Sequence, residues 1–129
     1  MQQPINYVLD IMHLERDLKR LTGKWSKTTG LKLNELRILV YVQQHPGMQI
    51  GEVASALTVA KASLAQSIGS LIDQGWLASE PTQHDRRLRV LTLTAKGREL
   101  METVDNQLEA SLSTSPALAF VDRLKALQA

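Results

Sequence analysis

The sequence predicts a mainly helical protein with one small β-hairpin, an α+β fold in which helices dominate. Apolar residues recur at three- and four-residue steps along most of the chain, which is the period of amphipathic helices. The pattern changes to alternation only between residues 76 and 93, as expected for paired strands. A length of 129 residues is typical of one domain, so residues 1–129 are expected to fold as a single domain.

The first helix is predicted over residues 4–22. Pro4 suits a first helical turn, where its missing N–H leaves no hydrogen bond unmade. Gly23 and then Gly30 indicate the end of the helix. The apolar stripe is wide for a helix that covers one side of a small domain, so either it packs on two sides or it meets a partner. The stripe contains Val8, Ile11, Leu14, Leu18 and Leu21, widened by Ile5, Leu9 and Met12.

Three short helices are predicted next. Asn34 is expected to cap the first, which ends before Pro46. The second covers about residues 50–57 and the third about residues 60–74, with Gly75 as its stop. Two short helices joined by a tight turn form the outline of a helix-turn-helix.

A β-hairpin with a charged, polar tip is predicted over residues 76–93. A hairpin directly after the second helix of a helix-turn-helix is a wing, so residues 33–94 are predicted to form a winged helix-turn-helix core. Within the tip, the interpretation gives loop positions without a functional role to Thr82, Gln83 and His84.

Two further helices are predicted over residues 95–128. Thr94 is expected to cap the first, and Ser115 followed by Pro116 to start the second. The flanking helices, over residues 4–22 and 95–128, carry apolar stripes that a monomer leaves uncovered. A two-fold homodimer would bury them, so both segments are predicted to be dimerisation helices.

The composition excludes several classes of protein. The absence of cysteine excludes disulfide scaffolds, thiolate metal sites and cysteine nucleophiles. No catalytic residue or cofactor is predicted, because the chain has no nucleophile elbow, Gly-rich phosphate loop or evident carboxylate pair. No metal site is predicted either, because the histidines lie on three different elements: His13, His45 and His84.

The chain has no apolar run long enough to span a membrane and no signal-peptide pattern, so a cytoplasmic protein without membrane contact is expected. The net charge is +2, but its distribution is uneven. Residues 61–98 carry a net charge of +3, and residues 99–129 carry −3. This distribution favours one face turned towards a polyanion.

Several motifs together resemble the MarR family of bacterial transcription regulators. They are a glycine that closes the second motif helix (Gly75), a wing with Asp85-Arg86-Arg87, and the segment Leu93-Thr94-Ala95-Lys96-Gly97 opening the next helix. Residues 49–54 are similar to the start of the first motif helix of that family. The resemblance covers roughly residues 33–100, and the combined spacing is more specific than any one motif.

The resemblance implies a homodimer that binds pseudo-palindromic double-stranded DNA, with half-sites about 34 Å apart. Members usually repress nearby genes, and many release DNA when a small phenolic or other ligand binds, so a small-molecule effector is also implied. Arg87 matches the wing arginine that enters the minor groove, and Asp85 would hold it by a charge-assisted hydrogen bond. Arg86 and Arg89 are candidates for phosphate contacts.

The helix that follows Ala60 would lie in the major groove. Its exposed candidates for DNA contact are Lys61, Ala62, Ser63, Ala65, Gln66 and Ser67. The sequence departs from the family here, since Ala60 replaces a frequent capping serine and residues 60–75 have no net charge. Ser79 and Glu80 replace a frequent arginine pair.

These departures leave a second function open, a winged-helix module that contacts other proteins and has lost DNA binding. Affinity for duplex DNA at low salt would distinguish the two. Alternatives also remain for four large side chains, which belong either to the core or to the lining of a ligand pocket: Trp25, Trp76, Met12 and Met101.

Overall fold

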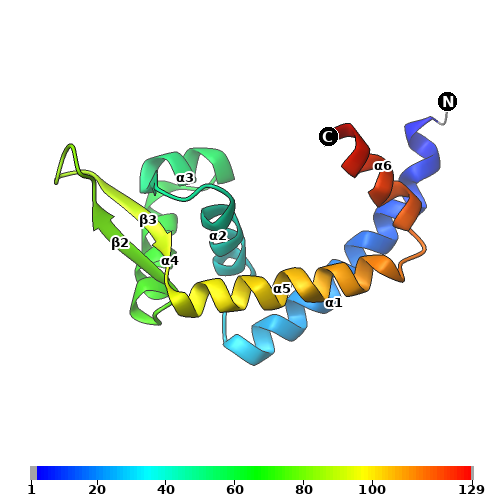
Figure 1. Ribbon diagram of the computed structural model, residues 1–129, viewed down its shortest axis with the longest axis horizontal. Coiled ribbons are helices and arrows are strands. Elements are labelled where there is room, and N and C mark those ends of the chain that lie inside the picture. The colour runs from blue at the N-terminus through cyan, green and yellow to red at the C-terminus, as the bar shows by residue number, and fades with distance from the viewer. Residues whose placement is uncertain (1–2, 129) are drawn as a thin grey trace. The chain divides into compact units, whose positions relative to one another are not determined.

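The computed structural model describes residues 3–128 and separates the chain into two compact units. Residues 3–30 and 104–128 form the helical unit, and residues 31–103 form the winged unit. Helix α5 (Ala95–Ser113) begins in the winged unit and continues into the helical unit (Figure 1). The predicted fold class, mainly helical with a small sheet, is confirmed.

The helical unit begins with a short 3-10 helix, η1 (Pro4–Tyr7), followed by α1 (Val8–Thr29). The predicted end of this helix at residue 22 is wrong, because α1 continues through Gly23 and ends before Gly30, whose φ is 77°. A glycine inside a helix costs only about 1 kcal/mol relative to alanine. The burial of Leu21 and Trp25 on either side of Gly23 outweighs that cost.

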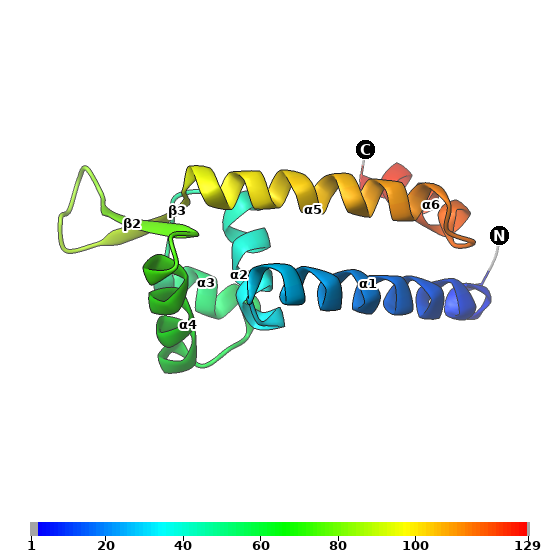
Figure 2. The same ribbon diagram turned by 90° about the horizontal axis from the view of Figure 1, so that it is seen from below.

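Helices α1 and α5 lie side by side in this unit, as Figure 2 shows. The indole Nε1 of Trp25 donates a hydrogen bond to Oε1 of Gln107, which joins the two helices. At the other end of α1, the rings of Tyr7 and Phe120 lie 5.0 Å apart between centroids. The second ring belongs to α6 (Leu118–Gln128), so the last helix packs beside the start of the first.

Helix α6 begins at Leu118, two residues later than the predicted start at Pro116. Ser115 still has a local capping role, because its Oγ accepts a hydrogen bond from the backbone N–H of Ala117 at 3.1 Å. The chain therefore makes a turn after Ser115 before the regular helix starts.

The winged unit contains the predicted short helices and a small sheet. Its elements up to α5 are α2 (Leu33–Gln44), β1 (Met48–Gln49), α3 (Ile50–Leu57), α4 (Lys61–Asp73), β2 (Leu77–Pro81) and β3 (Arg89–Leu93). Within the described residues the strands form an antiparallel sheet in the order β1-β3-β2. The sequence did not predict β1, because two residues are too few to show a period, although Met48 pairs with Leu91.

The prediction that Asn34 caps α2 is wrong. The helix begins two residues earlier, at Leu33, and its N-cap is Lys32, whose extended backbone has ψ of 160°. Glu35 decides this start, because its Oε1 accepts the Lys32 backbone N–H at 2.9 Å. Asn34 lies in the first turn instead, where its Oδ1 accepts a 3.4 Å hydrogen bond from Arg37.

Apolar side chains from several elements form the core of the winged unit. Its most deeply buried members include Leu39 of α2, Val53 of α3, Leu71 of α4 and Leu91 of β3. Four large side chains were expected either in the core or in the lining of a ligand pocket. Trp25, Trp76 and Met101 are buried, whereas Met12 is 57% exposed. Burial of the first three therefore follows the core interpretation.

The junction between α4, the sheet and α5 fixes the position of the wing. Gly75, with φ of 84°, ends α4, and the backbone N–H of Trp76 reaches back to the Leu71 carbonyl at 2.9 Å. Thr94 joins this turn to α5: its hydroxyl donates to the Gly75 carbonyl at 2.6 Å and accepts the Gly97 N–H at 3.1 Å.

No helix within residues 3–128 is both long and apolar enough to cross a membrane. In the same stretch, no group of three or more His, Cys, Asp or Glu side chains is placed to hold a metal ion.

Candidate nucleic-acid interface

Helix α4 exposes the residues that the sequence predicts to face DNA. Thr58, in the left-handed backbone region with φ of 55°, turns the chain out of α3 and towards α4. Leu64, Ile68 and Leu71 are buried, and they hold one side of α4 against the core. The opposite side has short or polar side chains: Lys61, Ala62, Ser63, Ala65 and Gln66 are exposed, and Ser67 is half-buried.

The start of α4 has no side-chain cap. Its N-cap residue is Ala60, which has no side-chain hydrogen-bonding group. The first backbone N–H groups of a helix have no partner inside the helix, so they remain available to water or to an anion. The only charged residues on α4 are Lys61 and Asp73, so this helix brings little net charge to its exposed face.

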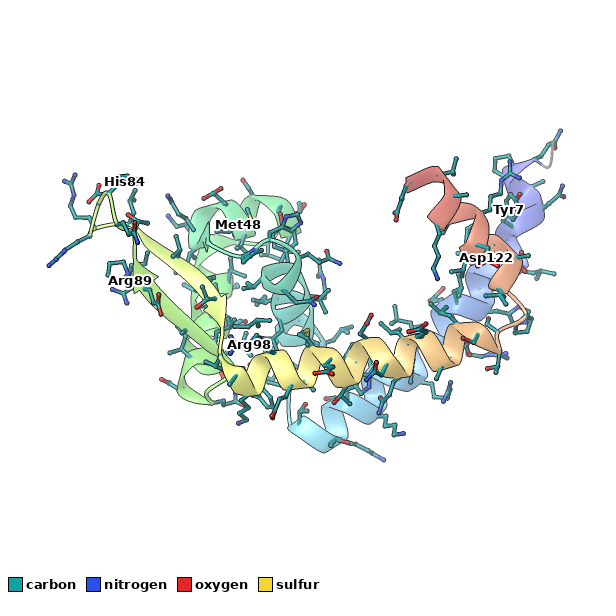
Figure 3. All side chains as sticks on the ribbon, viewed as in Figure 1. Tyr7, Met48, His84, Arg89, Arg98 and Asp122 are labelled. Carbon is teal, nitrogen blue, oxygen red and sulfur yellow. The ribbon has the colours of Figure 1, made fainter. Side chains whose placement is uncertain are left out.

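The wing is the hairpin of β2 and β3, with His84 in the loop at its tip (Figure 3). The loop is ordered by Thr82, whose hydroxyl donates to the Asp85 carbonyl at 2.6 Å and accepts the Asp85 N–H at 3.0 Å. Thr82 is a loop residue, as predicted, and these hydrogen bonds give it a structural role in the turn. A threonine three residues before an aspartate is the sequence signal of such a turn.

Asp85 and Arg87 form a tight contact in the wing loop. Nε and Nη2 of Arg87 donate to the two carboxylate oxygens of Asp85 at 3.1 and 3.3 Å, and the Arg87 backbone N–H donates at 3.0 Å. The Arg87 side-chain hydrogen bonds, followed by the backbone one, hold the pKa of Asp85 below its ordinary value of 3.8. The hydrogen bond expected between these residues is therefore present, and the Arg87 side chain remains 90% exposed.

Arg89 is also braced, by a residue across the hairpin. Its Nε donates to the hydroxyl of Ser79 at 2.8 Å, and its Nη2 donates to the carbonyl oxygen of Ser79 at 2.6 Å. Arg89 pairs with Pro81 in the strand register, so its side chain reaches diagonally back along β2. The sequence analysis missed this role of Ser79. A serine in a strand gives no sequence signal of which side chain it contacts across the hairpin.

The winged unit thus combines two features. The exposed cations of the wing lie at and beside its loop, where Arg86 is exposed as well. The exposed face of α4 lies on the same unit, and its buried side packs against α2, α3 and β2. Fixed guanidinium groups and an exposed helix face on the same unit suit a partner surface that carries phosphates.

Residues 29–88 match the family model described as MarR family. This part of the chain is therefore similar to the MarR family. The matched segment runs from the end of α1 through the wing loop. The resemblance carried by the wing and glycine motifs is therefore confirmed.

The curated relatives that this chain matches are named as transcriptional regulators. The chain is 30% identical over 73 residues to the HTH-type transcriptional regulator BilQ of Clostridium symbiosum, a match that covers 57% of this chain and 51% of BilQ. The chain spans between a third and two thirds of the length of the curated relatives that it matches.

Solved structures share the fold at low sequence identity. The crystal structure of RV1404 from Mycobacterium tuberculosis superposes with a TM-score of 0.78 at 16% identity, covering 99% of this chain and 94% of that one. The S. aureus MepR–DNA complex gives a TM-score of 0.71 at 16% identity, covering 92% and 95%.

Proposed function

We propose that this MarR-type protein is a homodimeric regulator that binds double-stranded DNA and represses nearby genes. The observation that carries the proposal is the wing, in which Asp85 holds an exposed Arg87. A guanidinium held in this way loses less side-chain freedom on binding, and it suits the negative potential of a narrow minor groove. The names of the relatives, a transcriptional regulator and a MepR–DNA complex, support the same proposal.

In this proposal α4 occupies the major groove. Lys61, Ser63 and Gln66 carry side chains that can hydrogen bond to base edges or phosphates. Arg86 lies beside Arg87 in the wing loop, and we assign it a phosphate contact. Arg89 is assigned the same role. Because its Nε and Nη2 already donate to Ser79, a phosphate has to share the Arg89 guanidinium with Ser79.

Dimerisation is assigned to residues 4–22 and 95–128, most of which belong to the helical unit. This unit exposes large apolar side chains, with Ile5 68%, Leu9 69% and Leu127 76% exposed. Between α1 and α5 lies a mostly apolar pocket of about 160 Å³, lined by Leu14, Asp17, Leu18, Leu21, Leu108, Ser111 and Leu112. Large exposed apolar side chains gathered on one unit favour a protein contact, and two-fold symmetry lets a second copy bury the same residues on both protomers.

The test is selection of the purified protein against random duplex DNA, followed by fluorescence anisotropy at two salt concentrations. Enrichment of an inverted repeat supports a sequence-specific dimeric regulator and supplies the half-site. Reporter expression from a promoter with that repeat then separates repression from activation. A small-molecule effector is part of the proposal only if a phenolic ligand lowers the affinity for the selected duplex.

The alternative function is a winged-helix module that binds proteins. The lack of net charge on α4 favours it. An absence of duplex binding at low salt, together with partner binding that salt does not weaken, would establish this alternative and reject the proposed regulator.

A further inference from the structure

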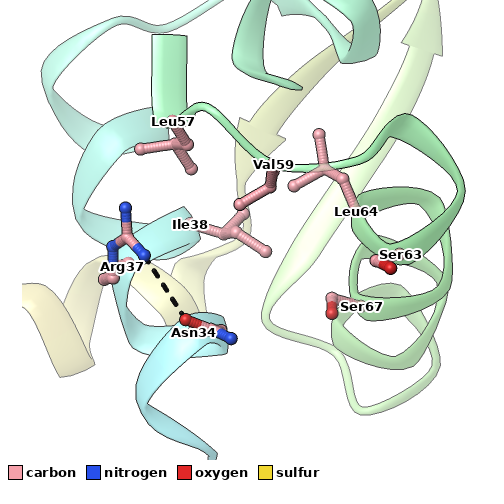
Figure 4. A pocket seen from close by; sticks show the side chains of 8 residues that line it. All are labelled: Asn34, Arg37, Ile38, Leu57, Val59, Ser63, Leu64 and Ser67. Carbon is pink, nitrogen blue, oxygen red and sulfur yellow. Dashed lines mark hydrogen bonds between the residues drawn. The ribbon is translucent and has the colours of Figure 1, made fainter. Parts of the chain in front are cut away.

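A small pocket lies between α2 and α4 of the winged unit, beside the exposed face of α4 (Figure 4). Arg37 and Asn34 contribute from α2, and Ser63 and Ser67 contribute from α4. The floor between these polar groups is apolar, and it consists of Ile38, Leu57, Val59 and Leu64. The pocket therefore combines a cation and hydroxyl groups at its rim with a hydrocarbon base.

The size of the pocket limits what it accepts. Its volume is about 50 Å³. This is room for about four water molecules, since one water needs roughly 10–15 Å³. Pockets for drug-sized ligands have about 300–1,000 Å³. A phosphate or carboxylate group fits this volume, whereas an aromatic effector does not.

The charges and donors favour an anion. Arg37 is exposed and donates to Oδ1 of Asn34 at 3.4 Å, a long hydrogen bond that leaves most of the guanidinium donors available. Ser63 lies in the first turn of α4, where Ala60 provides no side-chain cap. The backbone N–H groups of that turn and the helix dipole add to the attraction for a negative group.

We propose that one phosphate of the DNA backbone binds over this pocket, held by the guanidinium of Arg37 and the hydroxyl of Ser63. Such a contact carries no sequence information, but it fixes the register of α4 in the major groove. This inference rests on the proposed DNA-binding function, and it adds α2 to a surface that the sequence assigned only to α4 and the wing.

The test is a scan of the selected duplex with single methylphosphonates, each of which removes the charge of one phosphate. The wild-type protein should lose about tenfold in affinity at one phosphate of each half-site, the effect of one charged hydrogen bond. Arg37→Ala should bind the unmodified duplex about tenfold more weakly and lose less than the wild type at that same phosphate, because Ser63 still contacts it. The salt slope of this variant should be shallower than that of the wild type by about 0.9 for each phosphate that Arg37 neutralises.

Lys24→Ala is the control, because it removes one positive charge from an exposed position on α1 outside residues 4–22 and should leave affinity and slope unchanged. Urea unfolding of Arg37→Ala checks that the variant is folded. The wild type can bind the duplex while Arg37→Ala keeps the wild-type affinity and methylphosphonate pattern. In that case the proposed phosphate contact at Arg37 is wrong, but the proposed DNA binding is not. Inorganic phosphate alone can also be tested by NMR. If it shifts the signals of Ser63 while Arg37→Ala binds DNA with wild-type affinity, the pocket binds free phosphate, and the proposed contact with a DNA phosphate is wrong. If the wild type binds no duplex, the proposed function fails first.

Discussion

Gly97 lies against the main-chain carbonyl oxygen of Trp76, and a Cβ atom at position 97 would overlap that oxygen. The contact joins the start of α5 to the turn that leads into the wing. Gly97→Ala should therefore lower the free energy of unfolding by about 1–3 kcal/mol, the usual cost of forced overpacking. Urea unfolding followed by circular dichroism measures this change.

Gly23→Ala provides the matched control. A Cβ atom there meets nothing within 4 Å, and Gly23 lies inside α1. Alanine is favoured over glycine in a helix by about 0.5–1 kcal/mol, so this variant should be more stable than wild type. If Gly97→Ala and the wild type unfold at the same midpoint urea concentration, the close contact between Gly97 and Trp76 is contradicted.

Thr94→Val tests the hydrogen bonds at the same junction. The substitution removes the donor to the Gly75 carbonyl and the acceptor for the Gly97 N–H. We expect a loss of about 1–2 kcal/mol in the free energy of unfolding, as for other helix caps. Thr103→Val is the control, because its exposed hydroxyl bonds only to the Glu99 carbonyl within α5, and its effect should stay within about 0.5 kcal/mol. Equal losses in both variants would argue against a special role for Thr94.

The Asp85 carboxyl group should titrate below 3.8, because Arg87 hydrogen bonds to its charged form. A lowered pKa means that the wing contact stabilises the folded loop at neutral pH and weakens as the pH falls through the folded pKa. Carbon-detected NMR titration of the carboxyl group gives the value directly. In Arg87→Ala the pKa should rise towards 3.8, and a pKa that does not move would show that Arg87 is not its cause.

Arg87→Ala should weaken binding to the selected duplex at least about tenfold, since it removes a charged contact from the minor groove. Asp85→Asn keeps the cation but loses the ionic brace, so it should show a smaller loss. Lys24→Ala again controls for the change in net charge. Anisotropy titrations compare the four proteins, and a wild-type affinity for Arg87→Ala would reject the wing as a DNA contact.

Leu9→Glu should convert a dimer to a monomer. Leu9 is 69% exposed on α1, so a carboxylate there is tolerated by the monomer but is costly in an apolar interface. Leu33→Glu, at a 57% exposed position of the winged unit, is the control and should remain dimeric. Light scattering at micromolar concentration measures both, and a wild-type monomer would reject the dimerisation proposal.

Sequence patterns predicted the elements whose signals are local. Gly75 ends α4 and Thr94 caps α5, because a left-handed glycine and a capping hydroxyl act on their own neighbours. The Asp85–Arg87 contact was predictable for the same reason, since both partners lie within one turn of the loop.

Other features depend on parts of the chain that are distant in sequence. Strand β1 exists because β3 offers it an edge, which no two-residue pattern reveals. The bond between Arg89 and Ser79 depends on hairpin register, and the Arg37 pocket depends on how α2 packs against α4. Gly23 misled the prediction because tertiary burial of its neighbours outweighs its low helix propensity.

The short side chains on the outer face of α4 make this helix a convenient target for protein engineering. Ala62 and Ala65 are exposed, so longer residues there leave the buried Leu64 and Ile68 untouched. A small combinatorial library at these two positions would therefore vary the chemistry of the face without a loss of folding. Under the proposed function, such variants are a starting point for genetic switches that respond to operators of a chosen sequence.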